Sequence, residues 1–294
     1  MSKQPKDIKI LDLGFHPYAD TFLRKDQLNI SEPVYQLSCY LSKKTGVIRN
    51  GIKTDADSRY NLYDYSYTSS NSSYSKNYWE QYAKNLSQEL NITDNFKILE
   101  IGSNDGYLLK CFKKYTSKTW GVDASKLMCD LSKKNSIKTL NLIFNLKNSK
   151  KIKKKVGKFD VIISNNVLNH SDDVINFISG VKHLLNKNGS FIFELPYWYN
   201  LVLNEQFDQI YHEHVNYFTV KSSNFYLKKC GFQITKIEET NYHGGCIRVY
   251  AKVGSDTKSN SLIKNYIDKE NRLGLFKEKT YKKIMKNLNK KKIS

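Results

Sequence analysis

The sequence predicts an α/β protein, with a parallel sheet built from strand–helix crossover units and a small mixed domain in front of it. Three observations favour this fold class. From residue 96 onward, short apolar runs alternate with helix-length segments, which is typical of parallel sheets. A glycine-containing turn joins the first of these runs to a helical segment. The first 60 residues instead carry short β-like runs separated by turn residues.

The main domain is expected over residues 96–253. Helices are predicted after residue 105, after residue 125 and over residues 172–186. Seven apolar runs predict strands, and the last two favour an antiparallel pair. In chain order these runs are KILEIG, TWGVDA, TLNLIF, FDVIISNN, GSFIFELP, FQITKIEE and CIRVYAKV.

Three further segments flank this domain. Residues 1–60 are predicted to form the small N-terminal domain, with β-like runs IKILDLG, PVYQLSCYL and TGVIRNG. Residues 61–95 begin with a Tyr-rich stretch and continue as a linker helix. Residues 254–294 predict a Lys-rich helical tail.

Composition excludes several protein classes. With 39% hydrophobic and 13% aromatic residues, the chain of 294 residues can build a core and is not a disordered protein. No apolar run approaches the roughly 18 residues of a membrane span, and the N-terminus does not resemble a signal peptide, so we expect a cytoplasmic protein. The five cysteines are scattered and never form a CxxC, which makes a disulfide framework or a ribbon-type zinc site unlikely.

The net charge of +20 is concentrated in two segments. Residues 131–159 hold ten lysines and no acid, and residues 255–294 hold twelve basic and four acidic residues. Only five of the 48 basic residues are arginines, although arginine is the preferred partner of phosphates and base edges. We therefore interpret the lysines as solvated faces and nucleic acid as an unlikely partner, with a polyanion site as the open alternative.

A glycine loop follows the first strand of the main domain. The strand runs into EIGSNDG, residues 100–106, where Gly102 and Gly106 let the backbone approach a ligand beside a helix N-terminus. The spacing does not match GxGxxG, which a dinucleotide requires for its pyrophosphate, whereas S-adenosylmethionine (SAM) tolerates a looser loop. Asp123 ends the next strand and can accept the hydroxyls of a ribose. The alternative is an ordinary turn, with Asp123 as a helix cap.

Two polar clusters follow later strands. Asn165, Asn166, Asn169 and His170 interrupt the strand FDVIISNN at the end where such folds place the transferred group, although a helix cap nearby is an alternative. The segment FDQIYHEHVNYF, residues 207–218, is the densest in chemical groups.

Within that segment, an extended backbone would place Tyr211 and Glu213 on one face and His212 and His214 on the other. The open interpretations are an acid/base site, a structural polar corner and, least favoured, a metal site.

Together these motifs resemble the SAM-dependent sugar C-methyltransferases that act on nucleotide-activated deoxy-4-ketosugars. The resemblance covers about residues 1–253 and follows the family's order. The motifs that carry it are LDLGFHPYADTFL, YDYSYTSS, EIGSNDGYLL, ISNNVLNHSDD, FELPYW, FDQIYHEHVNYF and HGGCIRVY.

The resemblance implies a class I SAM methyltransferase (Rossmann-like) sheet and assigns roles to residues. His214 would be the catalytic base, assisted by Tyr211, Glu213 and Asn166. Substrate would be bound by Tyr65, Tyr67, His170 and His243, and no metal would be needed. The residues expected to bind SAM are Glu100, Gly102, Ser103, Asn104, Gly106, Asp123 and Asn165.

Two departures from the family pattern affect these expectations. The family's N-terminal domain usually holds zinc with two cysteine pairs, and here only Cys39 matches, so zinc is unlikely. Family members also continue with a second Rossmann-like domain that helps to hold the nucleotide. This chain ends about where that domain would begin, so a partner chain is a candidate for supplying the missing part.

The predicted function is therefore transfer of a methyl group from SAM to the carbon beside the ketone of a nucleotide-activated deoxy-ketosugar. A neutral imidazole with a pKa near 6.5 can remove the proton from that carbon, and hydroxyl or amide donors can stabilise the enolate. Two alternatives remain. One is a methyltransferase acting on RNA or another polyanion, and the other is a catalytically weakened module that binds SAM or a partner.

Overall fold

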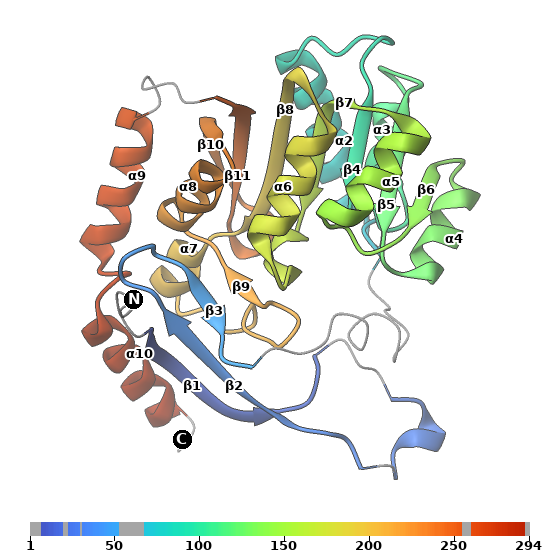
Figure 1. Cartoon of the computed structure of the whole chain (residues 1–294). Coiled ribbons are helices and arrows are strands. Elements are labelled where there is room, and N and C mark those ends of the chain that lie inside the picture. Colours follow the sequence, from blue (N-terminus) through green and yellow to red (C-terminus); the bar gives the residue numbers. More distant parts are fainter. Residues whose placement is uncertain (1–6, 20–22, 30, 53–67, 255–259, 292–294) are drawn as a thin grey trace.

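Two β-sheets organise the chain in the computed structural model (Figure 1), which describes residues 7–19, 23–29, 31–52, 68–254 and 260–291. The larger sheet has seven strands in the order β10-β11-β8-β7-β4-β5-β6. Its middle strands are parallel, and β11 runs antiparallel to both of its neighbours. All seven expected strands are present, namely β4 (Ile98–Ile101), β5 (Thr119–Asp123), β6 (Lys138–Asn141), β7 (Phe159–Asn165), β8 (Leu185–Pro196), β10 (Phe232–Thr240) and β11 (Cys246–Val253).

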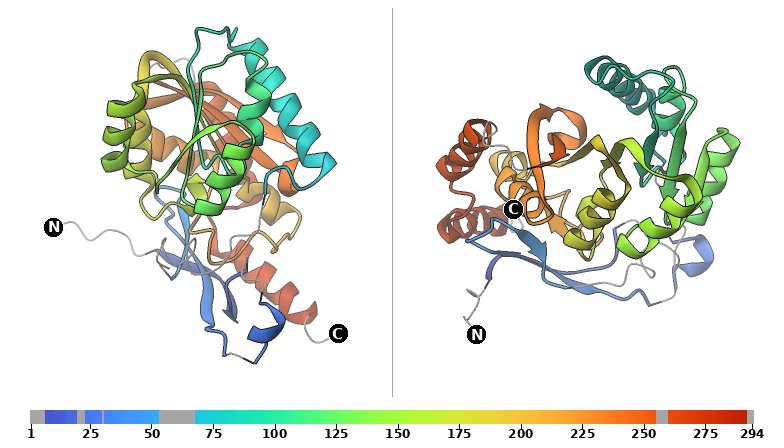
Figure 2. Two further views of the ribbon diagram at one scale, coloured as in Figure 1. Left: turned by 90° about the vertical axis from the view of Figure 1, so that its right-hand side faces the viewer. Right: turned by 45° about the horizontal axis from the view of Figure 1, so that its top comes forward.

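Helices cover both faces of this sheet, which confirms the predicted α/β class. Figure 2 shows α2 and α3 on one side of the sheet and α5 and α6 on the other. Each face has its own apolar core, and the strands between them are almost completely buried. The helices are α2 (Ser73–Glu89), α3 (Tyr107–Phe112), α4 (Lys126–Lys134), α5 (Leu146–Val156), α6 (Val174–Leu184) and α8 (Val220–Lys229).

Side-chain caps fix where several of these helices begin. Ser72 accepts a hydrogen bond from the backbone of Ser75 at the start of α2, and Ser125 does the same for Met128 in α4. Such caps satisfy backbone N–H groups that the helix itself leaves without a partner. Of the helices named above, α5 and α8 were not predicted individually. In α5, lysines mask a short apolar stripe that includes Ile152.

The smaller sheet combines the N-terminal segment with a strand from far along the chain. It consists of β1 (Ile8–His16), β2 (Tyr35–Leu41), β3 (Ile48–Asn50) and β9 (Asn216–Tyr217), in that order. Because β9 lies in the segment 207–218, this segment passes directly between the small sheet and the main domain. The packing here includes Cys39, Trp198 of α7 (Trp198–Leu203) and Tyr281.

The tail forms two helices, α9 (Asn260–Leu273) and α10 (Glu278–Lys291). Helix α10 packs against β1, and α9 contacts α8 through the fully buried Glu270. Its carboxylate accepts hydrogen bonds from the backbone of Val220 (2.5 Å) and Lys221 (3.3 Å) and from the hydroxyl of Tyr197 (2.9 Å). Glu270 therefore caps the N-terminus of α8, where a negative charge is favourable.

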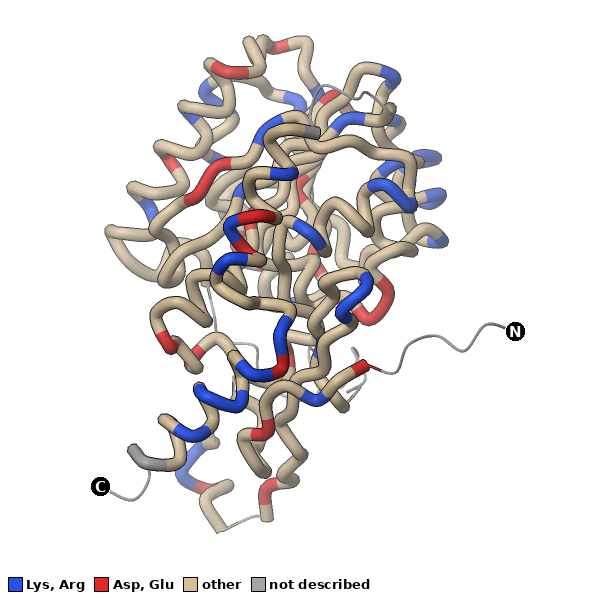
Figure 3. The backbone as a smooth tube through the Cα atoms, turned by 90° about the vertical axis from the view of Figure 1, so that its left-hand side faces the viewer, with Lys and Arg blue, Asp and Glu red and all other residues tan. Residues whose placement is uncertain are grey.

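The surface charges and the environment of the cysteines relate to the partners and metals considered from the sequence. Figure 3 shows basic segments spread from the top of the molecule to the C-terminal helix, with acidic segments among them. In the part of the chain that the structure describes, no helix is both long and apolar enough to cross a membrane, and no group of three His, Cys, Asp or Glu side chains could hold a metal ion. Cys39 is fully buried, and burial raises the pKa of its thiol to about 12.

Candidate active site

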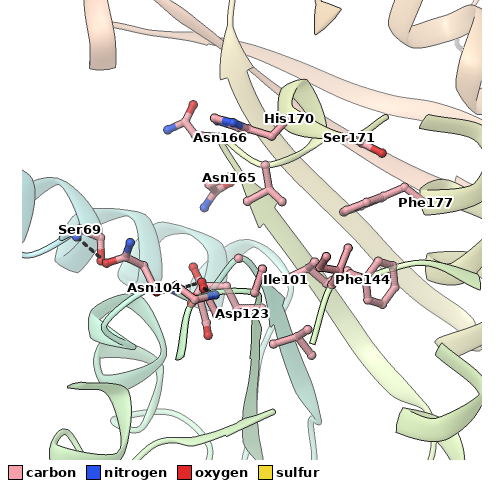
Figure 4. A pocket seen from close by; sticks show the side chains of 18 of the residues that line it. Ser69, Ile101, Asn104, Asp123, Phe144, Asn165, Asn166, His170, Ser171 and Phe177 are labelled. Atoms are coloured by element: carbon pink, nitrogen blue, oxygen red, sulfur yellow. Dashed lines mark hydrogen bonds between the residues drawn. The ribbon is translucent and has the colours of Figure 1, made fainter. Parts of the chain in front are cut away.

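A cavity of about 440 Å³ lies at the carboxyl ends of the central strands (Figure 4). Its walls come from the turns after β4, β5 and β7, and from the segments around residues 209–214 and residue 243. The strand order reverses between β4 and β7, and open α/β sheets bind ligands at that point. The volume falls within the range of about 300–1,000 Å³ that is usual for small-molecule sites.

Two features make glycine necessary at Gly102 and Gly106 in the loop after β4: the backbone conformation and the lack of space for a Cβ atom. Gly102 has a φ of +73°, and a Cβ there would lie 2.1 Å from a methyl group of Val167. Gly106 has a φ of +78°, and a Cβ there would approach Ser132 to 2.6 Å. Both positions therefore require the left-handed backbone and the missing side chain of glycine. Gly102 lines the cavity, whereas Gly106 lies behind its wall.

Asp123 connects this loop to the next strand. One carboxylate oxygen accepts a hydrogen bond from the backbone N–H of Asn104 (2.8 Å), and the other accepts one from Ser125 (2.9 Å). Each oxygen keeps a second lone pair that can face the cavity. Burial raises the pKa of Asp123 above its usual value. The side chain can thus hold the loop and still accept hydroxyl groups from a ligand.

A short serine segment fastens the start of α2 onto the glycine loop. The backbone N–H of Ser69 donates to the side-chain oxygen of Asn104 (2.9 Å), and its hydroxyl donates to Asp105 (2.6 Å). Asp105 also accepts from the backbone N–H (3.3 Å) and hydroxyl of Ser70. Trp79 completes the contact by donating its indole N–H to the carbonyl of Ser69 (3.2 Å). Ser69, Ser70 and Asp105 were not expected at the site from the sequence.

Several polar atoms in the cavity wall are buried and have no partner among the described residues. They are Oε2 of Glu100, Oγ of Ser103, Nδ2 of Asn165 and Oδ1 of Asn166. Buried polar groups normally find a partner, so these atoms are candidate contacts for a polar ligand. Burial, followed by the charges of Asp105 and Asp123, holds the pKa of Glu100 well above its usual value. A positively charged ligand would relieve this concentration of carboxylates.

Tyr211 and His214 form a hydrogen-bonded pair at the other end of the cavity. Nδ1 of His214 lies 2.8 Å from the carbonyl oxygen of Gln209, and a carbonyl only accepts, so Nδ1 carries the proton. Nε2 then accepts from the hydroxyl of Tyr211 at 2.7 Å. Burial lowers the pKa of His214 to about 4, well below the value near 6.5 expected from the sequence.

The backbone of this segment turns instead of extending. The N–H of His214 donates to the carbonyl of Tyr211 (3.1 Å), which brings these two side chains together. The extended alternative, in which Tyr211 shares a face with Glu213, is therefore wrong. His212 points toward the small sheet, with Nε2 3.2 Å from the carbonyl of Tyr35.

Two further histidines reach the cavity. The rings of His170 and His214 meet edge to face at 4.9 Å, and Figure 4 shows His170 beside Asn166. His243 occupies a left-handed backbone position, with φ +47°, and its ring lies against Tyr242. Burial lowers the pKa of His243, which favours the neutral form of this imidazole, as it does for His214.

The cavity brings together most of the residues expected from the sequence. Gly106 and the buried Glu213 lie outside its lining, and Tyr65 and Tyr67 lie outside the described residues. Trp79 lines the cavity unexpectedly, although its spacing of three from Tyr82 indicates a shared helix face. Of the expected residues, those lining the cavity are Glu100, Gly102, Ser103, Asn104, Asp123, Asn165, Asn166, His170, Tyr211, His214 and His243.

Two curated proteins are similar in sequence to parts of this chain. C-methyltransferase NovU of Streptomyces niveus is 28% identical over 164 residues, which are 56% of this chain and 39% of that protein. Ubiquinone biosynthesis O-methyltransferase of Pelagibacter ubique is 32% identical over 96 residues, covering 32% of this chain and 40% of that protein. The matched part thus spans about two fifths of each of these curated relatives.

Similar solved structures are more distant in sequence. Magnesium protoporphyrin IX methyltransferase (ChlM) from Synechocystis PCC 6803 with bound SAH has a TM-score of 0.48 and 15% identity, over 61% of this chain and 83% of that one. A SAM-dependent methyltransferase from Clostridium acetobutylicum has a TM-score of 0.46 and 16% identity, over 63% and 94% of the two chains.

The family described as "Methyltransferase domain" matches residues 74–237, which is more than half of the chain. This stretch runs from the first turn of α2 into β10 and contains the glycine loop and the Tyr211–His214 pair. The protein therefore belongs to the methyltransferase-domain family, and its main sheet has the class I fold of SAM-dependent methyltransferases that the sequence predicted.

Proposed function

We propose that the protein transfers a methyl group from SAM to the carbon beside the ketone of a nucleotide-activated deoxy-ketosugar. The observation that carries this proposal is the Tyr211–His214 pair, which lies at the end of the same cavity that begins at the glycine loop. A base at the end of the cavity away from the glycine loop suits an acceptor that must lose a proton before it is methylated. The similarity to a protein named as a C-methyltransferase supports carbon as the acceptor atom.

The residues that line the cavity support SAM as its ligand. Apolar side chains after β5 and β6, including Phe144, suit an adenine ring, and Asp123 suits the ribose hydroxyls. Buried carboxylates, with Glu100 lacking a partner for Oε2 among the described residues, suit the positive charges of the methionine portion. When bound, SAM supplies an electrophilic methyl group on a sulfonium centre.

The residues at the far end can prepare the acceptor. His214 is in its neutral form at pH 7, because its pKa is about 4, and its Nε2 carries the lone pair. When a ketone oxygen takes the hydrogen bond from the Tyr211 hydroxyl, Nε2 becomes available to the neighbouring C–H proton. Tyr211 then donates to the developing oxyanion, and the imidazolium charge forms beside it. Asn166 and His170 line the same cavity as this pair.

The test is exchange of the proton beside the ketone in deuterated water, with nucleotide-linked 4-ketosugars and S-adenosylhomocysteine (SAH). We expect His214→Asn to bind SAH normally and to lose the exchange. His212→Asn is the matched control, because His212 lies two residues away and faces the small sheet; this variant should keep the exchange. Undiminished exchange in His214→Asn would rule out His214 as the base.

A further inference from the structure

A buried ion pair lies behind the cavity wall, on the side of the sheet covered by α2. Arg248 of β11 is opposite Glu194 of β8 in the strand register. Nε of Arg248 donates to Oε2 of Glu194 at 2.8 Å, and the two side chains are 8% and 0% exposed. Neither residue lines the cavity. Burying two charges costs free energy unless close pairing and further hydrogen bonds compensate for the lost hydration. The groups around the pair therefore have to supply those hydrogen bonds.

The pair holds two tyrosines of α2. The hydroxyl of Tyr78 donates to Oε1 of Glu194 at 2.5 Å and accepts from Arg248 at 3.0 Å. The guanidinium of Arg248 lies 3.9 Å from the centre of the Tyr82 ring, a favourable cation–π distance. Tyr82 is 1% exposed, so its ring is fixed between the helix and the sheet.

Tyr82 connects the ion pair to the cavity wall through a hydrogen bond to Asn165. Its hydroxyl donates to Oδ1 of Asn165 at 3.3 Å, which turns the amide nitrogen of Asn165 to the other side. Asn165 lines the cavity, and its Nδ2 has no partner among the described residues. The backbone beside it is held as well, because Asn166 donates its N–H to the carbonyl of Glu194 (2.8 Å). The wall thus presents a fixed hydrogen-bond donor.

An acceptor lies on the next strand of the same cavity wall. Glu100 of the parallel strand β4 is opposite Ile163 of β7, and Asn165 lies two residues further along β7, so their Cα atoms are on the order of 8 Å apart. Oε2 of Glu100 also has no partner within the described part of the chain. A donor and a carboxylate on adjacent strands match the two groups of an α-amino acid, with the carboxylate at Asn165 and the ammonium at Glu100.

We propose that Tyr82 is a positioning residue that orients the amide of Asn165 so that Nδ2 donates to the carboxylate of the methionine portion of SAM. This inference rests on the proposed function, because it takes SAM as the ligand of the cavity. It adds a role for Tyr82 of α2 and for the Arg248–Glu194 pair, none of which lines the cavity. Without the Tyr82 hydroxyl, the amide can rotate and present its oxygen to the ligand carboxylate.

The test measures binding of two probes by calorimetry. SAH has the amino-acid portion, and 5′-methylthioadenosine lacks it. We expect Tyr82→Phe to weaken SAH binding about tenfold, the scale of one hydrogen bond to a charged group, and to leave 5′-methylthioadenosine binding unchanged. The matched control is Tyr250→Phe, which removes a buried hydroxyl bound to Glu238 (2.8 Å) at the outer edge of the same network and should bind both probes normally.

A double-mutant cycle separates positioning from a general loss of structure. Asn165→Ser should weaken SAH binding to a similar extent, and adding Tyr82→Phe should cause no further loss. Additive losses, an unchanged SAH affinity in Tyr82→Phe, or equal losses for both probes would overturn the inference. If the wild-type protein binds neither probe, the proposed function fails too. If it binds both and the variants behave like wild type, only the role of Tyr82 fails.

Discussion

Replacement of Gly102 by alanine should damage the glycine loop through two separable effects. Its φ of +73° costs an alanine about 1–2 kcal/mol. The new Cβ would also lie 2.1 Å from Cγ2 of Val167, and overpacking of this kind costs about 1–3 kcal/mol. The free energy of unfolding should therefore fall by about 2–5 kcal/mol, and SAH affinity should fall at least tenfold because the loop must move.

Gly14 provides the control for this prediction. Its φ is +89°, and a Cβ there would meet no described atom within 4 Å, so Gly14→Ala should lose only about 1–2 kcal/mol and retain SAH binding. The measurements are urea unfolding and calorimetry. Adding Val167→Ala to Gly102→Ala should restore part of the stability. If Gly102→Ala and Gly14→Ala lose the same stability, the steric part of the reasoning is refuted.

Three further predictions concern charged groups. Burial raises the pKa of Glu270 from 4.5 to about 7, so between these pH values the folded protein keeps a proton that the unfolded chain releases. The free energy of unfolding should therefore fall by about 3 kcal/mol between pH 4.5 and 8. Urea unfolding of Glu270→Gln over the same pH range should lack this fall. Arg248→Met leaves Glu194 buried without its ion-pair partner and should cost about 3–5 kcal/mol, of which Glu194→Gln in the same chain should recover a part. With a His214 pKa near 4, proton exchange should stay nearly constant from pH 8 to 5, whereas a base with a pKa of about 6.5 would lose most of its rate.

The main sheet was predictable because its signals are local. Strand Phe159–Asn165, for example, has the apolar run Val161–Ile163 at its middle and is buried along almost its whole length, which is the pattern of strands covered on both faces. The glycine loop and Asp123 follow their strands directly, and parallel topology places the ends of those strands at one edge. Any parallel arrangement of these strands would therefore bring most of the expected cofactor residues together.

The remaining features depend on contacts between distant segments. Pairing of β9 with β3 and the docking of Glu270 onto α8 have no local pattern. The family resemblance paired Tyr211 with His214, but the extended backbone considered for residues 211–214 was wrong, because the segment turns and has no glycine or proline to indicate a turn. Burial sets the pKa of His214, and burial of one side chain in a polar stretch cannot be derived from periodicity.

The central claim is tested most directly by incubating the purified protein with SAM and a panel of nucleotide-linked 4-ketosugars, followed by mass spectrometry and NMR of the products. The account predicts one added methyl group on the carbon beside the ketone. A methyl group on oxygen would contradict the role given to His214. Bound SAM with no methylated sugar from the panel would contradict the proposed acceptor and favour a module that binds SAM without transferring its methyl group.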